Sequence, residues 1–376
     1  MRNRCSPSAR KVIVDASEGR NPADENRAVA ALAPPYGRSR KRFNPRQMAR
    51  HREGMVPGDA YAALDLGTNN CRLLIAAAKP GGYDVVDAFS RIVRLGEGLG
   101  LSGELSQPAM DRTLDALRVC ANKLVWHGIV KQRLIATEAC RLAGNGAAFV
   151  TRVERETGLK LEIINRETEA NLAALGAAPL IDADADDAVI FDIGGGSTEV
   201  MWMERHPLQG FALKAWTSLP AGVVTLSERV GGGTSVSPAK FEEMRADVRL
   251  LLQPFVQSIA ARTGGRTVPS HLLGTSGTVT TIAGVHLGLR HYDRSRVDGC
   301  WMTSAAVEEV TGRLLAMSYQ QRIENGCIGR ERADLVLAGC AILEEVREAF
   351  PAQRIRVADR GLREGMLAEL MQVATT

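Results

Sequence analysis

Two segments of this chain share one pattern: a short apolar strand runs into an aspartate and then into a glycine-containing turn. They are Ala63-Leu-Asp-Leu-Gly-Thr-Asn-Asn70 and Ile190-Phe-Asp-Ile-Gly-Gly-Gly-Ser197. A turn without bulky side chains lets backbone N–H groups approach a phosphate closely, and a carboxylate at a strand end can hold a hydrated Mg²⁺ beside it. Because the two segments stand a domain length apart, they predict two duplicated lobes that bind a polyanion in the cleft between them.

Length and composition agree with two α/β lobes. A chain of 376 residues with 45% hydrophobic residues can bury two cores. Aromatic residues make up only 5% of the chain, and apolar strand-length runs alternate with helical patterns. These features favour mixed, mostly parallel sheets flanked by helices, with ligands at the carboxyl ends of the strands.

The positive net charge comes from the N-terminal region. Residues 1–58 hold 13 Lys and Arg against 5 Asp and Glu, whereas the rest of the chain is mildly acidic. We expect residues 1–58 to be a disordered basic extension; it could also be an arm that touches nucleic acid or membrane, or translation could begin at Met48 or Met55. The acidic remainder argues against a sequence-specific nucleic-acid surface.

The seven cysteines form no CxxC pair and no zinc-ligand spacing with histidine. Scattered cysteines of this kind are typical of buried small side chains in a reducing compartment, which predicts a cytoplasmic protein. No apolar run reaches the length of a membrane span, so no membrane partner is expected.

The expected first lobe covers residues 59–178. Strands are predicted at 62–66, 72–78, 84–94, 131–137 and 161–164, and helices at about 106–127, 147–157 and 167–175. Ser106 followed by Gln and Pro108 is an N-cap signal for the first of these helices.

The expected second lobe covers residues 179–360 and repeats the scheme. An acidic loop at 182–187 precedes a hairpin at 188–203, strands at 211–219, 271–273 and 355–357, and a helix that begins at Ser237-Pro238. The remaining segment, 361–376, is predicted to form a C-terminal helix from about Leu362 to Val373.

The second glycine loop is the most informative motif. Three consecutive glycines cost backbone entropy and contribute no packing, so folding alone explains them poorly. The hydroxyls of Ser197 and Thr198 can donate to phosphate, and Glu199 is placed to hold metal or orient a water. The short polar groups of the first loop suit phosphate oxygens in the same way. The candidate phosphate-binding residues are therefore Asp65, Gly67, Thr68, Asn69, Asn70, Gly194, Gly195, Gly196, Ser197 and Thr198, and the candidate metal ligands are Asp65, Asp192 and Glu199.

Three further motifs follow predicted strands. Arg141 could bind phosphate bidentately or form an ion pair with Glu138. Glu167 and Glu169 could be acidic residues that interact favourably with the dipole at a helix start. Alternatively, one of them could be a general base that activates water. Gly274-Thr-Ser-Gly-Thr278 is rich in N–H groups at a helix start, which makes Ser276 and Gly277 candidate anion ligands. Near the end of the chain, Asp359 and Arg363 are placed to close the cleft.

Taken together, the segments ALDLGTNNCRLLI, ATEACRLAGN, INRETEANLAALG, VIFDIGGGSTEV, LLGTSGT and ADRGLREG resemble the exopolyphosphatase/guanosine pentaphosphate phosphatase (Ppx/GppA) family. This family is a branch of the actin/Hsp70/sugar-kinase superfamily, and the likeness covers roughly residues 60–370. It implies two ribonuclease-H-like (actin-like ATPase) lobes with an interdomain cleft, and a last helix, within residues 361–376, that packs back on the first lobe.

The resemblance also implies an activity: Mg²⁺-dependent hydrolysis of a terminal phosphoanhydride in polyphosphate or guanosine pentaphosphate (pppGpp). Glu169 matches the family's proposed catalytic glutamate, Glu199 a second essential acid, and Arg141 a substrate-contacting arginine. A homodimer is expected from the resemblance alone. Asn70 and Arg360 depart from the family pattern, and longer members carry an additional helical C-terminal part.

Two other functions remain open at this level. A kinase of the same superfamily would use the cleft for ATP and transfer its γ-phosphate to an acceptor. A sensor would bind polyphosphate or a nucleotide without hydrolysing it rapidly. The presence of both Glu169 and Glu199 favours hydrolysis.

Overall fold

The computed structural model describes residues 60–129, 131–207 and 210–373. The expected basic extension, residues 1–58, lies outside the described residues. Within them, no helix is both long enough and apolar enough to cross a lipid bilayer.

The first sheet has five strands in the order β3-β2-β1-β4-β5, and β2 runs antiparallel to its neighbours while β1, β4 and β5 are parallel. Its strands are β1 (Ala60–Leu66), β2 (Asn70–Lys79), β3 (Gly82–Ile92), β4 (Lys131–Ala136) and β5 (Glu162–Ile163). The helices of this part are α2 (Leu99–Ser102), α3 (Gln107–Trp126), α4 (Glu138–Leu142), α5 (Gly146–Thr157) and α6 (Arg166–Ala177). As expected, Ser106 caps α3: its hydroxyl accepts from the backbone N–H of Ala109.

The second sheet repeats this order and adds one strand: β10-β11-β9-β6-β7-β8. Its strands are β6 (Asp187–Ile193), β7 (Thr198–His206), β8 (Gly210–Leu219), β9 (Leu272–Thr275), β10 (Trp301–Thr303) and β11 (Arg354–Ala358). The helical segments are η1 (Ala178–Leu180), α7 (Val223–Arg229), α8 (Pro238–Thr263), α9 (Gly277–His286), α10 (Arg294–Val297), α11 (Ser304–Ala316), α12 (Tyr319–Glu324), α13 (Val336–Ala349) and α14 (Leu362–Val373). Two ribonuclease-H-like lobes are therefore present.

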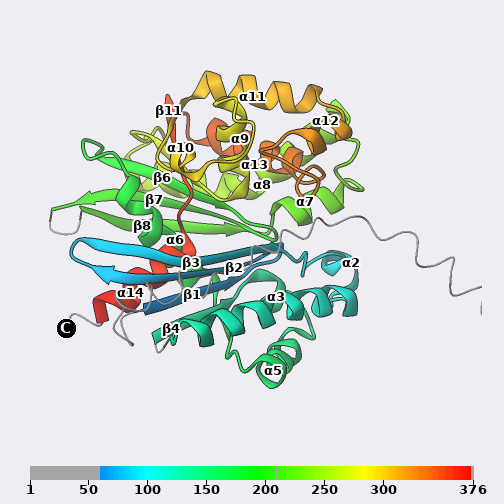
Figure 1. The fold of residues 1–376 in the computed structure, drawn as a ribbon. Helices are drawn as coiled ribbons and strands as arrows, with labels where there is room; N and C mark the ends of the chain where they lie inside the picture. Colours follow the sequence, from blue (N-terminus) through cyan, green and yellow to red (C-terminus); the bar gives the residue numbers. More distant parts are fainter. Residues whose placement is uncertain (1–59, 130, 208–209, 374–376) are drawn as a thin grey trace, which may run out of the picture. The chain divides into compact units, whose positions relative to one another are not determined.

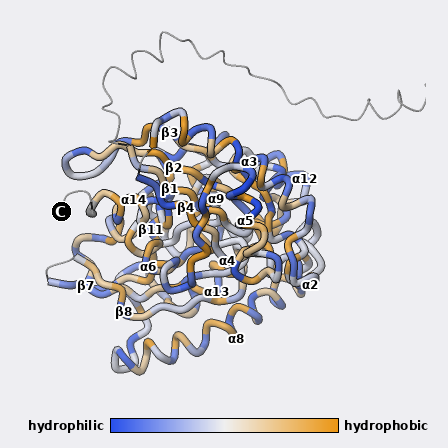
Figure 2. Tube along the Cα trace, turned by 90° about the horizontal axis from the view of Figure 1, so that it is seen from below, coloured by the Kyte–Doolittle hydropathy of each residue, from blue (hydrophilic) through white to orange (hydrophobic). Residues whose placement is uncertain are grey.

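Helices cover both sheets. α3 and α5 lie beyond the first sheet, α8, α11 and α13 lie beyond the second, and α6 and α14 lie between the two sheets (Figure 1). Hydrophilic and hydrophobic residues alternate in short blocks along α8 (Figure 2), as expected for a helix with one buried face.

The helix α6 joins the two cores. Its alanines pack with buried residues of β6 and β7, while Leu172 packs with β1 and α14. Glycines allow α6 and α14 to approach closely: a Cβ at Gly176 would lie 1.9 Å from the carbonyl oxygen of Gly361, and one at Gly365 would lie 2.0 Å from that of Leu172. Glu169 therefore lies on a helix that packs against both lobes.

The third strand ends earlier than the sequence suggests. A strand is expected up to Arg94, but β3 ends at Ile92 because the N–H groups of Val93 and Arg94 both donate to the carbonyl of Asn69. The chain thus leaves the sheet to contact the first glycine loop. The expected strand at 161–164 is likewise only two residues long.

Candidate active site

The two aspartate-headed loops meet in one cavity of about 130 Å³ between the lobes. A Cβ at Gly195 would lie 3.0 Å from both the amide nitrogen of Asn69 and the Cβ of Thr68. The loops are thus in van der Waals contact, and glycine at position 195 is what permits this approach. The predicted convergence of the two loops is found in the structure.

Most of the predicted site residues line this cavity. They are Asp65, Gly67, Thr68, Asn69, Asn70, Glu169, Asp192, Gly194, Gly195, Gly196, Ser197, Glu199, Ser276 and Gly277.

Two predicted ligands have other positions. Thr198 is fully buried, and its hydroxyl donates to the carbonyl of Ala221 at 2.6 Å. Arg141 does not line the cavity; its guanidinium donates to Glu138 and to Glu169 Oε2 at 2.9 Å, and to the carbonyl of Ile164 at 2.5 Å. The structure therefore shows the ion-pair alternative for Arg141, with the candidate base as one of its partners.

Four carboxylates with raised pKa values line the cavity. Burial raises the pKa of Asp65 and raises that of Asp192 to about 6. Burial, followed by the neighbouring Asp192 carboxylate, raises the pKa of Glu199 to about 7. Burial and the charge of Glu199 likewise raise the pKa of Glu169 well above its usual range. Such a cluster costs folding energy, which is typical of a functional site.

Hydrogen bonds orient Glu199 within this cluster. The hydroxyls of Ser197 and Ser218 both donate to its Oε1 atom at 2.8 Å. Both bonds favour the charged form and oppose the effect of burial on its pKa. Ser197 therefore supports Glu199 as well as facing the cavity.

Glu138 is a further carboxylate at the cavity, and sequence reasoning considered it only as a partner of Arg141. Burial alone would raise its pKa, but hydrogen bonds from Arg166 and Arg141 outweigh burial and lower the pKa. Glu138 thus stays ionised, binds both arginines and holds Arg141 beside Glu169. Its place directly after a buried strand was the available signal.

Two arginines at the cavity, Arg72 and Arg332, were missed by sequence reasoning. The guanidinium of Arg72 has no hydrogen-bond or ion-pair partner within residues 60–129, 131–207 and 210–373. That of Arg332 donates to Thr281 Oγ1 at 3.3 Å. Burial, followed by the charge of Arg72, lowers the pKa of Arg332. Two neighbouring cations that form no salt bridge within the described residues are typical of an anion-binding site.

Arg72 could have been found from hairpin pairing. It is the direct cross-strand partner of Asp65 in the β1–β2 register, so both side chains lie on the same face of the sheet. Arg332 carries no such signal, because it lies in a turn far along the chain.

Several buried polar atoms of the cavity residues lack partners among the described residues. They are Asn69 Oδ1, Asn70 Oδ1 and Ser276 Oγ. Ser276 also has a φ of 95°, which is uncommon for a residue other than glycine. Unpaired buried polar atoms and local strain are both typical of ligand sites. These atoms are available to a bound polyanion and its counterion.

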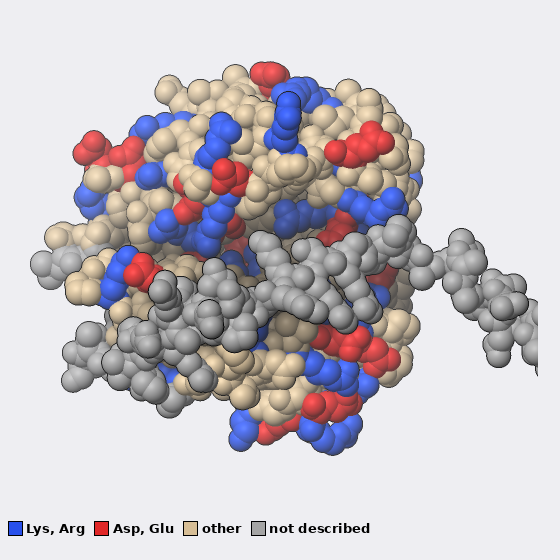
Figure 3. All heavy atoms as spheres, viewed as in Figure 1, with Lys and Arg blue, Asp and Glu red and all other residues tan. Residues whose placement is uncertain are grey.

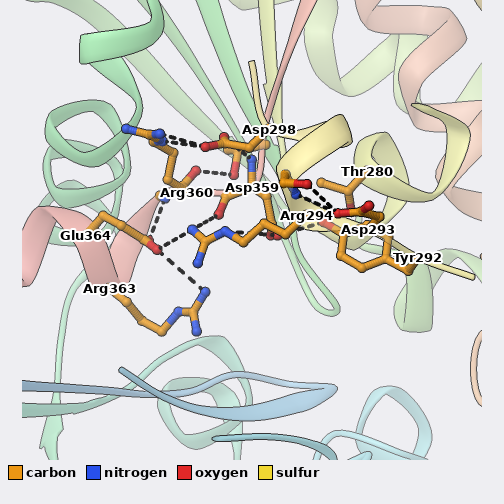
Figure 4. Close-up of polar contacts among 12 residues, drawn as sticks. Thr280, Tyr292, Asp293, Arg294, Asp298, Asp359, Arg360, Arg363 and Glu364 are labelled. Atoms are coloured by element: carbon orange, nitrogen blue, oxygen red, sulfur yellow. Dashed lines mark hydrogen bonds and ion pairs between the residues drawn. The ribbon is translucent and has the colours of Figure 1, made fainter. Parts of the chain in front are cut away.

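Asp359, just before α14, and Arg363, in the first turn of α14, line one side of the cavity, where the sequence predicts that they close the cleft. Tyr292 donates to Asp359 Oδ2 at 2.6 Å, and Arg294 donates to the Asp359 carbonyl at 2.6 Å (Figure 4). Arg360, which departs from the family pattern, forms an ion pair with Asp298 at 2.6 Å. Arg360 therefore anchors the chain just before α14 to the loop that contains Asp298.

The charges of the outer surface are mixed. On the face seen in Figure 3, Lys and Arg are interspersed with Asp and Glu. The cysteines of the described region are all free, and those at 71, 120, 140, 327 and 340 are buried.

The cavity residues fit a hydrated divalent cation better than a fully protein-ligated one. In the described part of the chain, no group of three or more His, Cys, Asp or Glu residues is arranged to hold a metal ion. Mg²⁺ usually takes only one or two carboxylates and completes its shell with water and substrate phosphates. Asp65, Asp192 and Glu199 supply such carboxylates, and a bound cation would offset the burial that raises their pKa values.

Comparison with known proteins agrees with this reading of the site. The model of the Ppx/GppA phosphatase family matches residues 74–374. Exopolyphosphatase 2 of Mycobacterium tuberculosis is 29% identical over 326 residues, which cover 82% of this chain and 98% of the relative. Guanosine-5'-triphosphate,3'-diphosphate pyrophosphatase of Aeromonas hydrophila is 29% identical over 311 residues, which cover 83% of this chain and 59% of that relative.

The fold agrees as well. The crystal structure of the Aquifex aeolicus member of the Ppx/GppA family superposes with a TM-score of 0.67 at 26% identity, and the match covers 84% of this chain and 98% of that one. The chain therefore belongs to the Ppx/GppA phosphatase family and is a hydrolase.

Proposed function

We propose that this protein releases orthophosphate from the terminal phosphoanhydride of inorganic polyphosphate, of pppGpp, or of both, with Mg²⁺ as cofactor. The observation that carries the proposal is the position of Glu169. It lies in the same cavity as two phosphate-type loops and the guanidinium groups of Arg72 and Arg332, neither of which forms a salt bridge within the described residues. The names of the two relatives support these two substrates.

In the proposed reaction, a water attacks the terminal phosphorus in line with the bridging oxygen. The water proton moves to a carboxylate oxygen of Glu169, the bond from phosphorus to the bridging oxygen breaks, and the shortened anion leaves. Its raised pKa makes Glu169 a stronger base than an exposed carboxylate. The hydrogen bond from Arg141 to Oε2 fixes the orientation of that carboxylate.

The remaining groups bind the phosphate and balance its charge. Backbone N–H groups of the two loops and the guanidinium groups of Arg72 and Arg332 stabilise the negative charge that develops on the phosphoryl oxygens. One or two of the carboxylates of Asp65, Asp192 and Glu199 would hold a hydrated Mg²⁺, which would supply further charge neutralisation when it is bound.

We place this reaction in the cytoplasm, since the buried cysteines of the described residues are free. A homodimer remains a prediction from the resemblance.

The direct test is orthophosphate release by the purified chain from polyphosphate and from pppGpp, with kcat/KM compared. Each substrate is incubated with the parent protein in the presence of Mg²⁺ or of EDTA. A parallel incubation with Mg²⁺ uses the Glu169→Gln variant in place of the parent protein. Release with Mg²⁺ alone and without any phosphate acceptor supports hydrolysis and excludes a kinase. A folded protein that releases no orthophosphate from either substrate contradicts the proposal.

A further inference from the structure

Arg94 and Asp334 form an ion pair between the two lobes. The guanidinium of Arg94 donates from Nη1 and Nη2 to the two carboxylate oxygens of Asp334, both at 2.8 Å, and from Nη2 to the carbonyl of Glu331 at 3.1 Å. The side chains are 29% and 19% exposed, so the pair is partly shielded from water. Bidentate pairs of this kind are among the stronger and more directional polar contacts.

On the side of the first lobe, Arg94 is attached to the first phosphate loop. Its N–H donates to the carbonyl of Asn69 at 3.0 Å, next to a 2.8 Å bond from Val93. The backbone of Arg94 has a φ of 47°, a left-handed conformation that arginine seldom adopts. Arg112 donates to the carbonyls of Val93 and Arg94 and so holds this conformation.

On the side of the second lobe, Asp334 belongs to the turn that carries Arg332. Leu335 and Val336, which follow it directly, also line the cavity. The carbonyl of Asp334 accepts a hydrogen bond from Ser227 in α7 at 3.3 Å. The ion pair therefore connects the phosphate loop of one lobe to the cavity arginine of the other.

A second contact between the lobes lies four residues after Arg94 in the sequence. The N–H of Gly98 donates to Glu228 Oε1 at 2.9 Å. Arg94 and Gly98 thus fasten one segment of the first lobe to the second lobe at two points. Neither contact includes a residue assigned above to the reaction.

We propose that Arg94 is a positioning residue: its ion pair with Asp334 holds the lobes closed, so that the Asn69 loop and Arg332 face the same phosphate. The expected change in KM rests on the proposed function, whereas the expected opening of the cleft does not. Without the pair, more of the free protein has an open cleft. Substrate binding must then close it, which raises the apparent dissociation constant in inverse proportion to the fraction of the free protein that remains closed.

The variants Arg94→Gln, Asp334→Asn and the double variant test this. Each single change should raise KM for orthophosphate release about tenfold and leave kcat within about threefold. The double variant should be no worse than the more severe single one, because the same contact is lost in all three. A double effect equal to the product of the single effects contradicts a shared contact.

A second measurement does not need turnover. Spin labels at Val125→Cys in α3 and Leu250→Cys in α8, which are 83% and 70% exposed, report the distance between the lobes in a background with Cys5 and Cys300 replaced by serine. Arg94→Gln should lengthen or broaden that distance without substrate. An unchanged distance overturns the inference whatever happens to KM.

Arg245→Gln is the matched control. It breaks a partly buried arginine–glutamate contact with Glu345 at 2.7 Å, between α8 and α13 of the second lobe only. Neither KM nor the distance between labels should change in this variant; a change equal to that of Arg94→Gln contradicts a specific role for the pair between lobes. If the parent protein releases no phosphate, the proposed function fails, while the distance measurement still decides on the ion pair.

Discussion

Asp192 and Glu199 are direct cross-strand partners in the β6–β7 hairpin, so a half-buried and a buried carboxylate project from the same face of one sheet. Like charges in this arrangement destabilise a hairpin. The corresponding pair of the first lobe is Asp65 with Arg72, which carries opposite charges. The duplicated hairpins therefore differ where they face the cavity: the first presents an acid with a cation, and the second presents two acids.

This arrangement predicts a pH-dependent stability. The pKa of Glu199 rises from 4.5 to about 7 on folding, so its favourable contribution is complete below about pH 4.5 and is lost as the pH rises through 7. Glu199→Gln should therefore increase the free energy of unfolding at pH 8 by roughly 1–3 kcal/mol and have little effect near pH 4.5. Urea unfolding without divalent cations measures both values.

The control for this prediction is Glu308→Gln, which changes an exposed glutamate of α11. It should leave the free energy of unfolding unchanged at both pH values. If Glu199→Gln behaved like the control, burial of an ionised Glu199 would not cost stability.

Glu169→Gln should reduce turnover about 10²- to 10⁴-fold, the usual contribution of a general base, while substrate binding is largely retained. Orthophosphate release gives the first quantity and calorimetric titration with substrate the second. Glu167→Gln serves as the control, because Glu167 is exposed on the same helix and does not line the cavity. Equal losses in the two variants would remove Glu169 from the mechanism.

Replacement of either cavity arginine should weaken substrate binding. Arg72→Ala and Arg332→Ala each remove a guanidinium that faces the cavity, and we expect kcat/KM to fall roughly 10- to 100-fold because a hydrogen bond to a charged group is lost. Arg313→Ala, an exposed arginine of α11, should have no effect. Steady-state kinetics at two salt concentrations checks that the loss exceeds a general change in charge.

Gly195→Ala should reduce activity strongly, because the added Cβ would lie 3.0 Å from two atoms of the first loop and push the loops apart. Gly312→Ala is the matched change: Gly312 lies in α11, and a Cβ there meets nothing within 4 Å. It should stabilise the protein by up to about 1 kcal/mol through helix propensity and keep full activity. Full activity in Gly195→Ala would show that the loops need not touch.

Local sequence pattern alone determined much of the fold and part of the site. The two Asp-x-Gly turns, the N-cap at Ser106 and the helix after Asn165 depend on neighbouring residues, so strand, turn and helix signals placed Asp65, Asp192 and Glu169 correctly at element ends. The hairpin after each aspartate could be predicted as well, because two apolar strand-length runs flank each glycine turn in the sequence.

Only the tertiary structure decided which side chains share the cavity. Arg332 lines the cavity from a turn that no local pattern predicts. Arg141 instead forms ion pairs with Glu138 and Glu169, and the Thr198 hydroxyl donates to the carbonyl of Ala221. The ion pair of Arg94 with Asp334 joins residues 240 positions apart. Such contacts depend on how two lobes pack against each other, and packing between distant segments leaves no periodic signal in a single sequence.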